Sequence, residues 1–173
     1  MIAKRYCEKL ESKQLGIADI SYCFSGLYFT GLNVISSNNF KDDIDSPDLS
    51  DKIFLNTHKT YAELPALPFQ YYKIFLSAYD IDESEEGMGD LYDDIIDVYH
   101  DLKVSIIYWE MGCKFTAVLY LTDTFSHWGE HIVWYLFAAH SYSNDFPEQF
   151  LKFQGEGCIK HDPAKHKSDD SVS

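Results

Sequence analysis

The sequence predicts an all-α fold, an antiparallel bundle of about five helices, in one domain over residues 1–154, with a polar tail at 155–173. Several stretches repeat apolar residues at alternating spacings of three and four, which is the pattern of helices that bury one face. The 173-residue length suits a single core, and 46% hydrophobic residues can fill it. The tail has the polar composition of disordered segments. The sequence contains no run of roughly eighteen apolar residues, so we expect no membrane-spanning helix.

The first half of the chain contains one clear helical pattern. Residues 16–35 carry apolar positions at helical spacing, although their aromatics and glycines would also suit a strand. These positions are Ile17, Ile20, Phe24, Leu27, Gly31 and Val34. The polar, proline-containing segment 36–52 predicts a loop. Pro65 and Pro68 favour a helix that begins near them, and the acidic, glycine-containing residues 82–90 predict a connector.

The second half predicts two long helices and a short one. Residues 90–111 carry the apolar seam Leu91, Ile95, Val98, Leu102, Ile106 and Trp109. Gly112 suits the position after a helix end. A second helix from about Lys114 carries the seam Val118, Leu121, Phe125, Trp128, Ile132, Tyr135 and Ala139. Because their connection is short, we expect these helices to be antiparallel neighbours. Asp145 and Pro147 favour a short helix within 144–154.

Charge and cysteine usage restrict the classes of partner. The net charge is −14 and the isoelectric point is about 4.7. Such an acidic chain repels phosphate backbones and anionic lipids, so we expect no nucleic acid and no membrane but a basic protein as the partner. The four cysteines, Cys7, Cys23, Cys113 and Cys158, form no metal-type cluster, and the first residues lack the apolar region of a signal peptide. These features predict a cytoplasmic protein with reduced thiols.

The stretch "SHWGEHIVWYLFAAH", residues 126–140, raises the question of a metal site. His127 and His131 are four residues apart and flank Glu130, which fits the H-x-x-E-H form of zinc peptidases. A third ligand is not evident downstream, Gly129 loosens the turn, and no acid–histidine pairing on a second helix stands out. We therefore favour packed, hydrogen-bonded histidines and expect no catalytic residue, no metal and no cofactor. A metal-dependent hydrolase that uses these three residues remains the alternative.

A second metal pattern lies in the preceding helix. Asp97 and His100 form an acid-x-x-His motif of the kind that di-metal bundles point inward. On a wheel with 100° per residue, Asp97 lies about 140° from the centre of the apolar seam. We therefore expect Asp97 to face solvent.

The strongest signal is a stripe of acids. From Asp80 to Asp101 the chain contains ten acidic residues and neither lysine nor arginine. A solvated face usually mixes both signs of charge, so a single-sign stripe with nearby tyrosines also fits a surface for a cationic partner. Both interpretations stay open. The predicted partner-binding residues are Asp90, Asp93, Asp94, Asp97, Asp101 and Tyr108.

Two motifs, "DLYDDIIDVYHDLK" and "FSHWGEHIVWYLFAAH", carry a resemblance. With them, residues 88–143 resemble an uncharacterised bacterial family, a domain of unknown function whose members look like small all-helical proteins. The resemblance implies no activity. The small, acidic, cytosolic type is also similar to immunity proteins of bacterial toxin systems. That likeness implies a non-enzymatic inhibitor that covers the active site of a basic toxin, such as a nuclease. An oligomerising scaffold is a further alternative.

Overall fold

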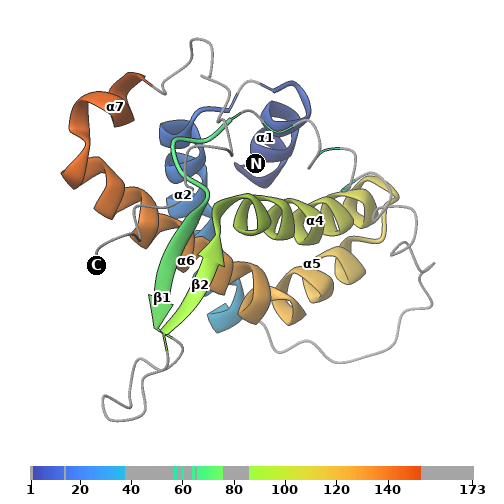
Figure 1. Ribbon diagram of the computed structural model, residues 1–173. Coiled ribbons are helices and arrows are strands. Elements are labelled where there is room, and N and C mark those ends of the chain that lie inside the picture. Colours follow the sequence, from blue (N-terminus) through green and yellow to red (C-terminus); the bar gives the residue numbers. More distant parts are fainter. Residues whose placement is uncertain are drawn as a thin grey trace, which may run out of the picture.

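A computed structural model describes residues 2–13, 15–37, 57, 60, 64, 66–75 and 86–152 (Figure 1). Within them lie α1 (Ile2–Glu11), α2 (Ile17–Ser37), α4 (Leu91–Glu110), α5 (Lys114–Asp123), α6 (Phe125–Asp145), α7 (Pro147–Lys152), β1 (Tyr71–Phe75) and β2 (Glu86–Asp90). The predicted helical fold is confirmed, with one added hairpin. In the described part of the chain, every helix is too short or too polar to cross a membrane. The predicted loop beyond residue 37 and the tail at 155–173 lie outside the described residues.

Helix α4 is the centre of the fold. It packs against α1, α5 and α6, and α2 packs on α6 from the other side (Figure 1). The predicted seam of α4 is buried from Leu91 to Ile106, as expected from its spacing. Trp109 is the exception, because 41% of it is exposed and Lys114 lies over its ring. The seam therefore ends one turn earlier than the pattern predicts.

Both N-terminal helices bury one face. In α2, the predicted residues Ile17, Ile20, Phe24 and Leu27 are buried, which confirms the helix. Helix α1 was not predicted, although its buried residues recur at helical spacing. These residues are Ala3, Tyr6, Cys7 and Leu10.

The hairpin replaces a predicted helix and a predicted connector. Strand β1 pairs antiparallel with β2, and Tyr72 lies opposite Gly89. Tyrosine, isoleucine and phenylalanine in "YYKIF" favour a strand over the helix that Pro65 and Pro68 suggested. Gly89 is required by close approach, since a Cβ there would clash with Cζ of Tyr72. Strand β2 then runs directly into α4.

The second long helix of the sequence prediction is in fact two helices. Thr124 has φ −87° and ψ 0° and separates α5 from α6. Its carbonyl accepts hydrogen bonds from the backbone N–H groups of His127 and Trp128, and so begins α6. Its hydroxyl is turned back to the carbonyl of Tyr120, at 2.9 Å. A threonine side chain that bonds four residues back competes with regular helix geometry, and this explains a break that the apolar period conceals.

Two predicted helix boundaries are confirmed. Gly112 follows α4 with φ +87°, a conformation that glycine adopts without steric cost. Helix α7 begins at Pro147, where the missing proline N–H is not needed. Asp145 ends α6 rather than capping α7, and Phe146 occupies the position before Pro147.

Candidate functional site

Two acids of α4, Asp94 and Asp101, are buried against α6, and a third, Asp97, is shared between α6 and solvent. Only 2% of Asp94 and 4% of Asp101 is exposed, and the side chain of Asp97 is 40% exposed. The expectation that Asp97 faces solvent holds only in part, because it treated the widest apolar seam as the only covered side of α4, whereas Asp97 also contacts His131 of α6. Since α4 is covered by several helices, its acidic side is also an interhelical side. The predicted stripe is therefore not one exposed surface.

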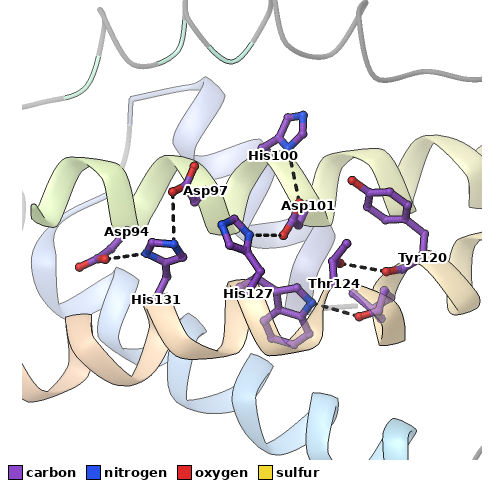
Figure 2. Close-up of polar contacts among 10 residues, drawn as sticks. Asp94, Asp97, His100, Asp101, Tyr120, Thr124, His127 and His131 are labelled. Carbon is purple, nitrogen blue, oxygen red and sulfur yellow. Dashed lines mark hydrogen bonds and ion pairs between the residues drawn. The ribbon is translucent and has the colours of Figure 1, made fainter. Parts of the chain in front are cut away.

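Asp94 connects the hairpin to His131. Its Oδ1 lies 2.8 Å from Nδ1 of His131, and its Oδ2 accepts a hydrogen bond from the hydroxyl of Tyr72. The opposite nitrogen of His131, Nε2, lies 3.3 Å from Oδ2 of Asp97 (Figure 2). His131 also packs edge-on against Trp134, with ring centroids 5.6 Å apart. One imidazole is therefore held between two acids of the facing helix.

His127 repeats this arrangement one turn earlier in α6. Its Nδ1 lies 2.9 Å from Oδ2 of Asp101 (Figure 2). The other oxygen of Asp101 lies 3.4 Å from Nδ1 of His100. The rings of His127 and His131 are nearly perpendicular, with centroids 4.8 Å apart. Each histidine thus has its own buried carboxylate partner.

The pairing determines which imidazole nitrogen can bind a ligand. An ionised carboxylate only accepts hydrogen bonds, so Nδ1 of each histidine must be the donor. In the neutral ring, the lone pair then lies on Nε2. Three potential ligand atoms lie within 4.8 Å of one another, namely a carboxylate oxygen of Asp97 and one ring nitrogen each of His127 and His131. The side chain of His127 is 54% exposed, whereas that of His131 is 16% exposed, so the group opens to solvent on one side.

Buried acids dominate the electrostatics of this group. Burial lowers the pKa of His131, but the hydrogen bond from its ring to Asp94 and the charges of Asp94 and Asp97 raise it, and the net shift is upward. Burial raises the pKa of Asp94, and the hydrogen bonds of His131 and Tyr72 oppose that shift. For Asp93, which is exposed, partial burial and then the neighbouring carboxylates raise the pKa. The site is therefore a region of negative potential that favours cations.

Two nitrogens and one carboxylate oxygen can hold a divalent transition metal. Zinc, iron and manganese sites use these ligand types, and three protein ligands leave positions for water or substrate. Histidine ligands in such sites donate their other N–H to a carboxylate, as His127 and His131 do here. In the absence of metal, a protonated His131 satisfies both Asp94 and Asp97. The contacts fit either a metal centre or packed, charge-paired histidines.

One of the three reasons given against a metal site was wrong, and a second is weakened. A candidate third ligand exists in Asp97, which lies upstream on α4 and not in the downstream segment. Acid–histidine pairs on a second helix do exist, since Asp94 and Asp101 make them. Glu130, by contrast, is exposed and does not belong to the group. Its charge acts on His131 but it is not a ligand in this arrangement.

The remaining predicted partner-binding residues have separate positions. Asp90 caps the N-terminus of α4 by accepting a hydrogen bond from the N–H of Tyr92, and it also accepts one from Gln70. Tyr108 is buried and packs near Tyr120. Asp93 is exposed. The structure brings Asp94, Asp97 and Asp101 together with the histidines but assigns structural contacts to Asp90 and Tyr108.

A sequence signal for this site exists. The predicted helices were antiparallel neighbours, and one carries acids at residues 94, 97 and 101 while the other carries histidines at 127 and 131. An antiparallel arrangement pairs residue 101 with 127 and residue 94 with 131, as the hydrogen bonds show. Tyr72 was missed because its segment was predicted to be helical.

The chain matches no protein-family model, no curated protein sequence and no solved structure. The resemblance of residues 88–143 to a bacterial family therefore stays a prediction. The function has to be argued from the geometry of the α4–α6 group alone.

Proposed function

We propose that this chain is a metal-binding protein. Asp97, His127 and His131 hold one divalent transition-metal ion between α4 and α6, and the open side of the group leaves coordination positions for water or substrate. Two imidazoles and one carboxylate suit zinc, iron(II) or manganese better than calcium or magnesium, because the latter two ions prefer ligand sets made of oxygen alone.

One observation carries this proposal. Both histidines are paired at Nδ1 with a buried carboxylate, and Nε2 of His131 lies 3.3 Å from Asp97, so the neutral His131 ring directs its Nε2 lone pair toward this acid. Such carboxylate–histidine pairs fix the tautomer and orientation of metal-binding imidazoles and increase their basicity. A single buried histidine commonly needs one acid for its charge. By that measure Asp94 and Asp101 suffice for the two histidines, and the half-exposed Asp97 is one acid in excess.

The open positions suggest a reaction class. A metal with three protein ligands lowers the pKa of bound water and polarises carbonyl or phosphoryl groups, which is the basis of metal-dependent hydrolysis. The same ligand set with iron(II) is used for oxygen chemistry. The acids around the group disfavour anionic substrates, because they add negative charge beside the metal.

The test is the metal content of the full chain purified without an affinity tag. We expect about one equivalent of zinc, iron or manganese per chain by elemental analysis, consistent with one three-ligand site. The metal identity selects between hydrolytic and oxygen chemistry. The chain contains seven histidines, so metal at this site has to be distinguished from metal on other histidines. A titration of the metal-free protein with Co²⁺ should therefore accompany the elemental analysis. The result that contradicts the proposal is a chain that holds no metal and also takes up none in the titration.

We propose a second function for the acids that remain exposed. Asp93 and Glu130 are exposed and Asp97 is half-exposed, on a chain with net charge −14. Together they support binding of a basic protein partner, as an immunity protein binds a toxin. The free thiols of Cys7, Cys23 and Cys113 support a cytoplasmic setting for such a complex. This surface is narrower than the stripe predicted from sequence.

The partner proposal predicts a specific charge-reversal effect. With a basic toxin domain encoded at the same locus, the double variant Asp93→Lys, Glu130→Lys should associate at least about tenfold more slowly at low salt, because both acids steer the encounter. The measurement is the association rate by surface plasmon resonance. The double variant Asp145→Lys, Glu148→Lys is a matched control, since it makes the same change in net charge at exposed residues of α6 and α7. Equal association rates for both double variants would exclude the proposed surface.

A further inference from the structure

We propose that Tyr72 is a positioning residue for the metal centre and that the β1–β2 hairpin is coupled to metal binding through it. The inference rests on the proposed metal-binding function. Tyr72 donates its hydroxyl hydrogen to Oδ2 of Asp94, while Oδ1 of the same carboxylate accepts from His131. A chain of side chains thus runs from the hairpin to the Nε2 atom that faces Asp97.

The protonation of Tyr72 suits this role. Burial and the hydrogen bond to Asp94 raise the pKa of Tyr72, so the hydroxyl keeps its proton and remains a donor. Asp94 then has both oxygens engaged as acceptors, which fixes the plane of its carboxylate. A fixed carboxylate orients the imidazole of His131, whereas a free one could rotate. Tyr72 therefore acts on the metal through two intermediate side chains and does not touch it.

The hairpin is built to place this hydroxyl. Tyr72 lies opposite Gly89 in the strand register, and its ring crosses the space where a side chain of residue 89 would be. A Cβ at position 89 would clash with Cζ of Tyr72 and would lie 2.7 Å from its hydroxyl oxygen. Strand β2 ends at Asp90, four residues before Asp94, and continues without a loop into α4. The hairpin is further joined to this end of α4 by the hydrogen bond from Gln70 to Asp90, at 2.9 Å.

Thermodynamic linkage makes this coupling reciprocal. If the hydrogen bond of Tyr72 strengthens metal binding, then bound metal must stabilise the docked hairpin by the same factor. The carboxylate that partners a metal-binding histidine typically contributes about 10–100-fold to affinity. Tyr72 is one hydrogen bond further from the metal, so we expect about tenfold, the lower end of that range. Metal should therefore slow hydrogen exchange of the amides in residues 71–75 and 86–90, and should do so only when residue 72 has a hydroxyl.

The test compares Co²⁺ affinity of the full-length chain with that of Tyr72→Phe and Gly89→Ala. We expect each variant to bind Co²⁺ about tenfold more weakly, because one lacks the hydroxyl and the other displaces the ring that carries it. The double variant should be no weaker than the worse single variant, since both remove the same hydrogen bond. Tyr71→Phe is the matched control, because Tyr71 is the exposed neighbour in β1 and should retain full affinity.

The outcomes separate the two proposals. A wild-type chain that binds no Co²⁺ overturns both. A wild-type chain that binds, together with a Tyr72→Phe variant that loses less than about twofold in affinity, overturns the positioning role alone and leaves the metal site intact. Metal-induced protection of the hairpin amides that persists in Tyr72→Phe also contradicts the coupling. Protection in the wild type that disappears in Tyr72→Phe but not in Tyr71→Phe supports it.

Discussion

Replacing His131 by alanine is expected to abolish stoichiometric metal binding and to destabilise the metal-free fold. The variant removes a proposed ligand nitrogen and also the partner of Asp94, a carboxylate with almost no solvent exposure. Removing one partner of a buried ion pair typically costs about 3–5 kcal/mol, because the remaining charge is left uncompensated. Isothermal titration with Zn²⁺ measures the first effect, and urea unfolding of the metal-free protein measures the second.

A control and a milder variant keep this result interpretable. His140→Ala changes an exposed histidine of the same helix, so it should bind metal as the wild type does. Asp97→Ala removes a proposed ligand that is half-exposed, and it should lose metal binding with little change in stability. Asp93→Ala, one turn earlier on α4, is its matched control. If Asp97→Ala and Asp93→Ala bind Zn²⁺ with equal affinity, Asp97 is not a ligand.

Trp128→Ala should lower the free energy of unfolding by about 3–5 kcal/mol, which is the usual cost of deleting a buried tryptophan. Trp128 is 1% exposed and packs edge-on against Phe125, with ring centroids 4.7 Å apart. Its indole N–H donates to the carbonyl of Leu121 at 3.1 Å, across the break between α5 and α6. The loss therefore leaves a cavity and also loosens the junction that precedes His127. Urea unfolding with a constant m-value is the measurement.

Trp109→Ala provides the contrast. The helical wheel placed Trp109 in the buried seam, whereas the structure leaves 41% of it exposed with Lys114 over its ring. We expect this variant to cost below about 1 kcal/mol, the range of an exposed cation–π contact. Similar losses for the two tryptophan variants would contradict the positions that the structure gives them.

The sequence by itself determined the helices whose apolar period is long. The seam from Leu91 to Ile106 and the face from Ile17 to Leu27 are buried as predicted, because a stable helix must place its apolar stripe on the core. Local chemistry was also sufficient at Gly112 and Pro147, where backbone preference alone decides a helix end or start. These features depend on residues close in the chain.

The tertiary structure decided the hairpin and the break at Thr124. Prolines at 65 and 68 suit a helix start as well as a turn, and only pairing with residues 86–90 makes residues 71–75 a strand. At Thr124 the apolar period continues unchanged from α5 into α6, so the change of direction leaves no trace in the pattern. Short elements with ambiguous propensity take their conformation from their contacts.

The site itself was present in the sequence only as separate halves. The sequence supplied the acids of α4 and the histidines of α6, and their antiparallel order. A helical wheel, however, gives direction relative to one helix axis and cannot tell which neighbouring helix covers a polar side. Only the packing of α6 on α4 turned Asp94, Asp97 and Asp101 from a supposed solvent face into partners of His127 and His131. Only the docking of the hairpin placed Tyr72 on Asp94.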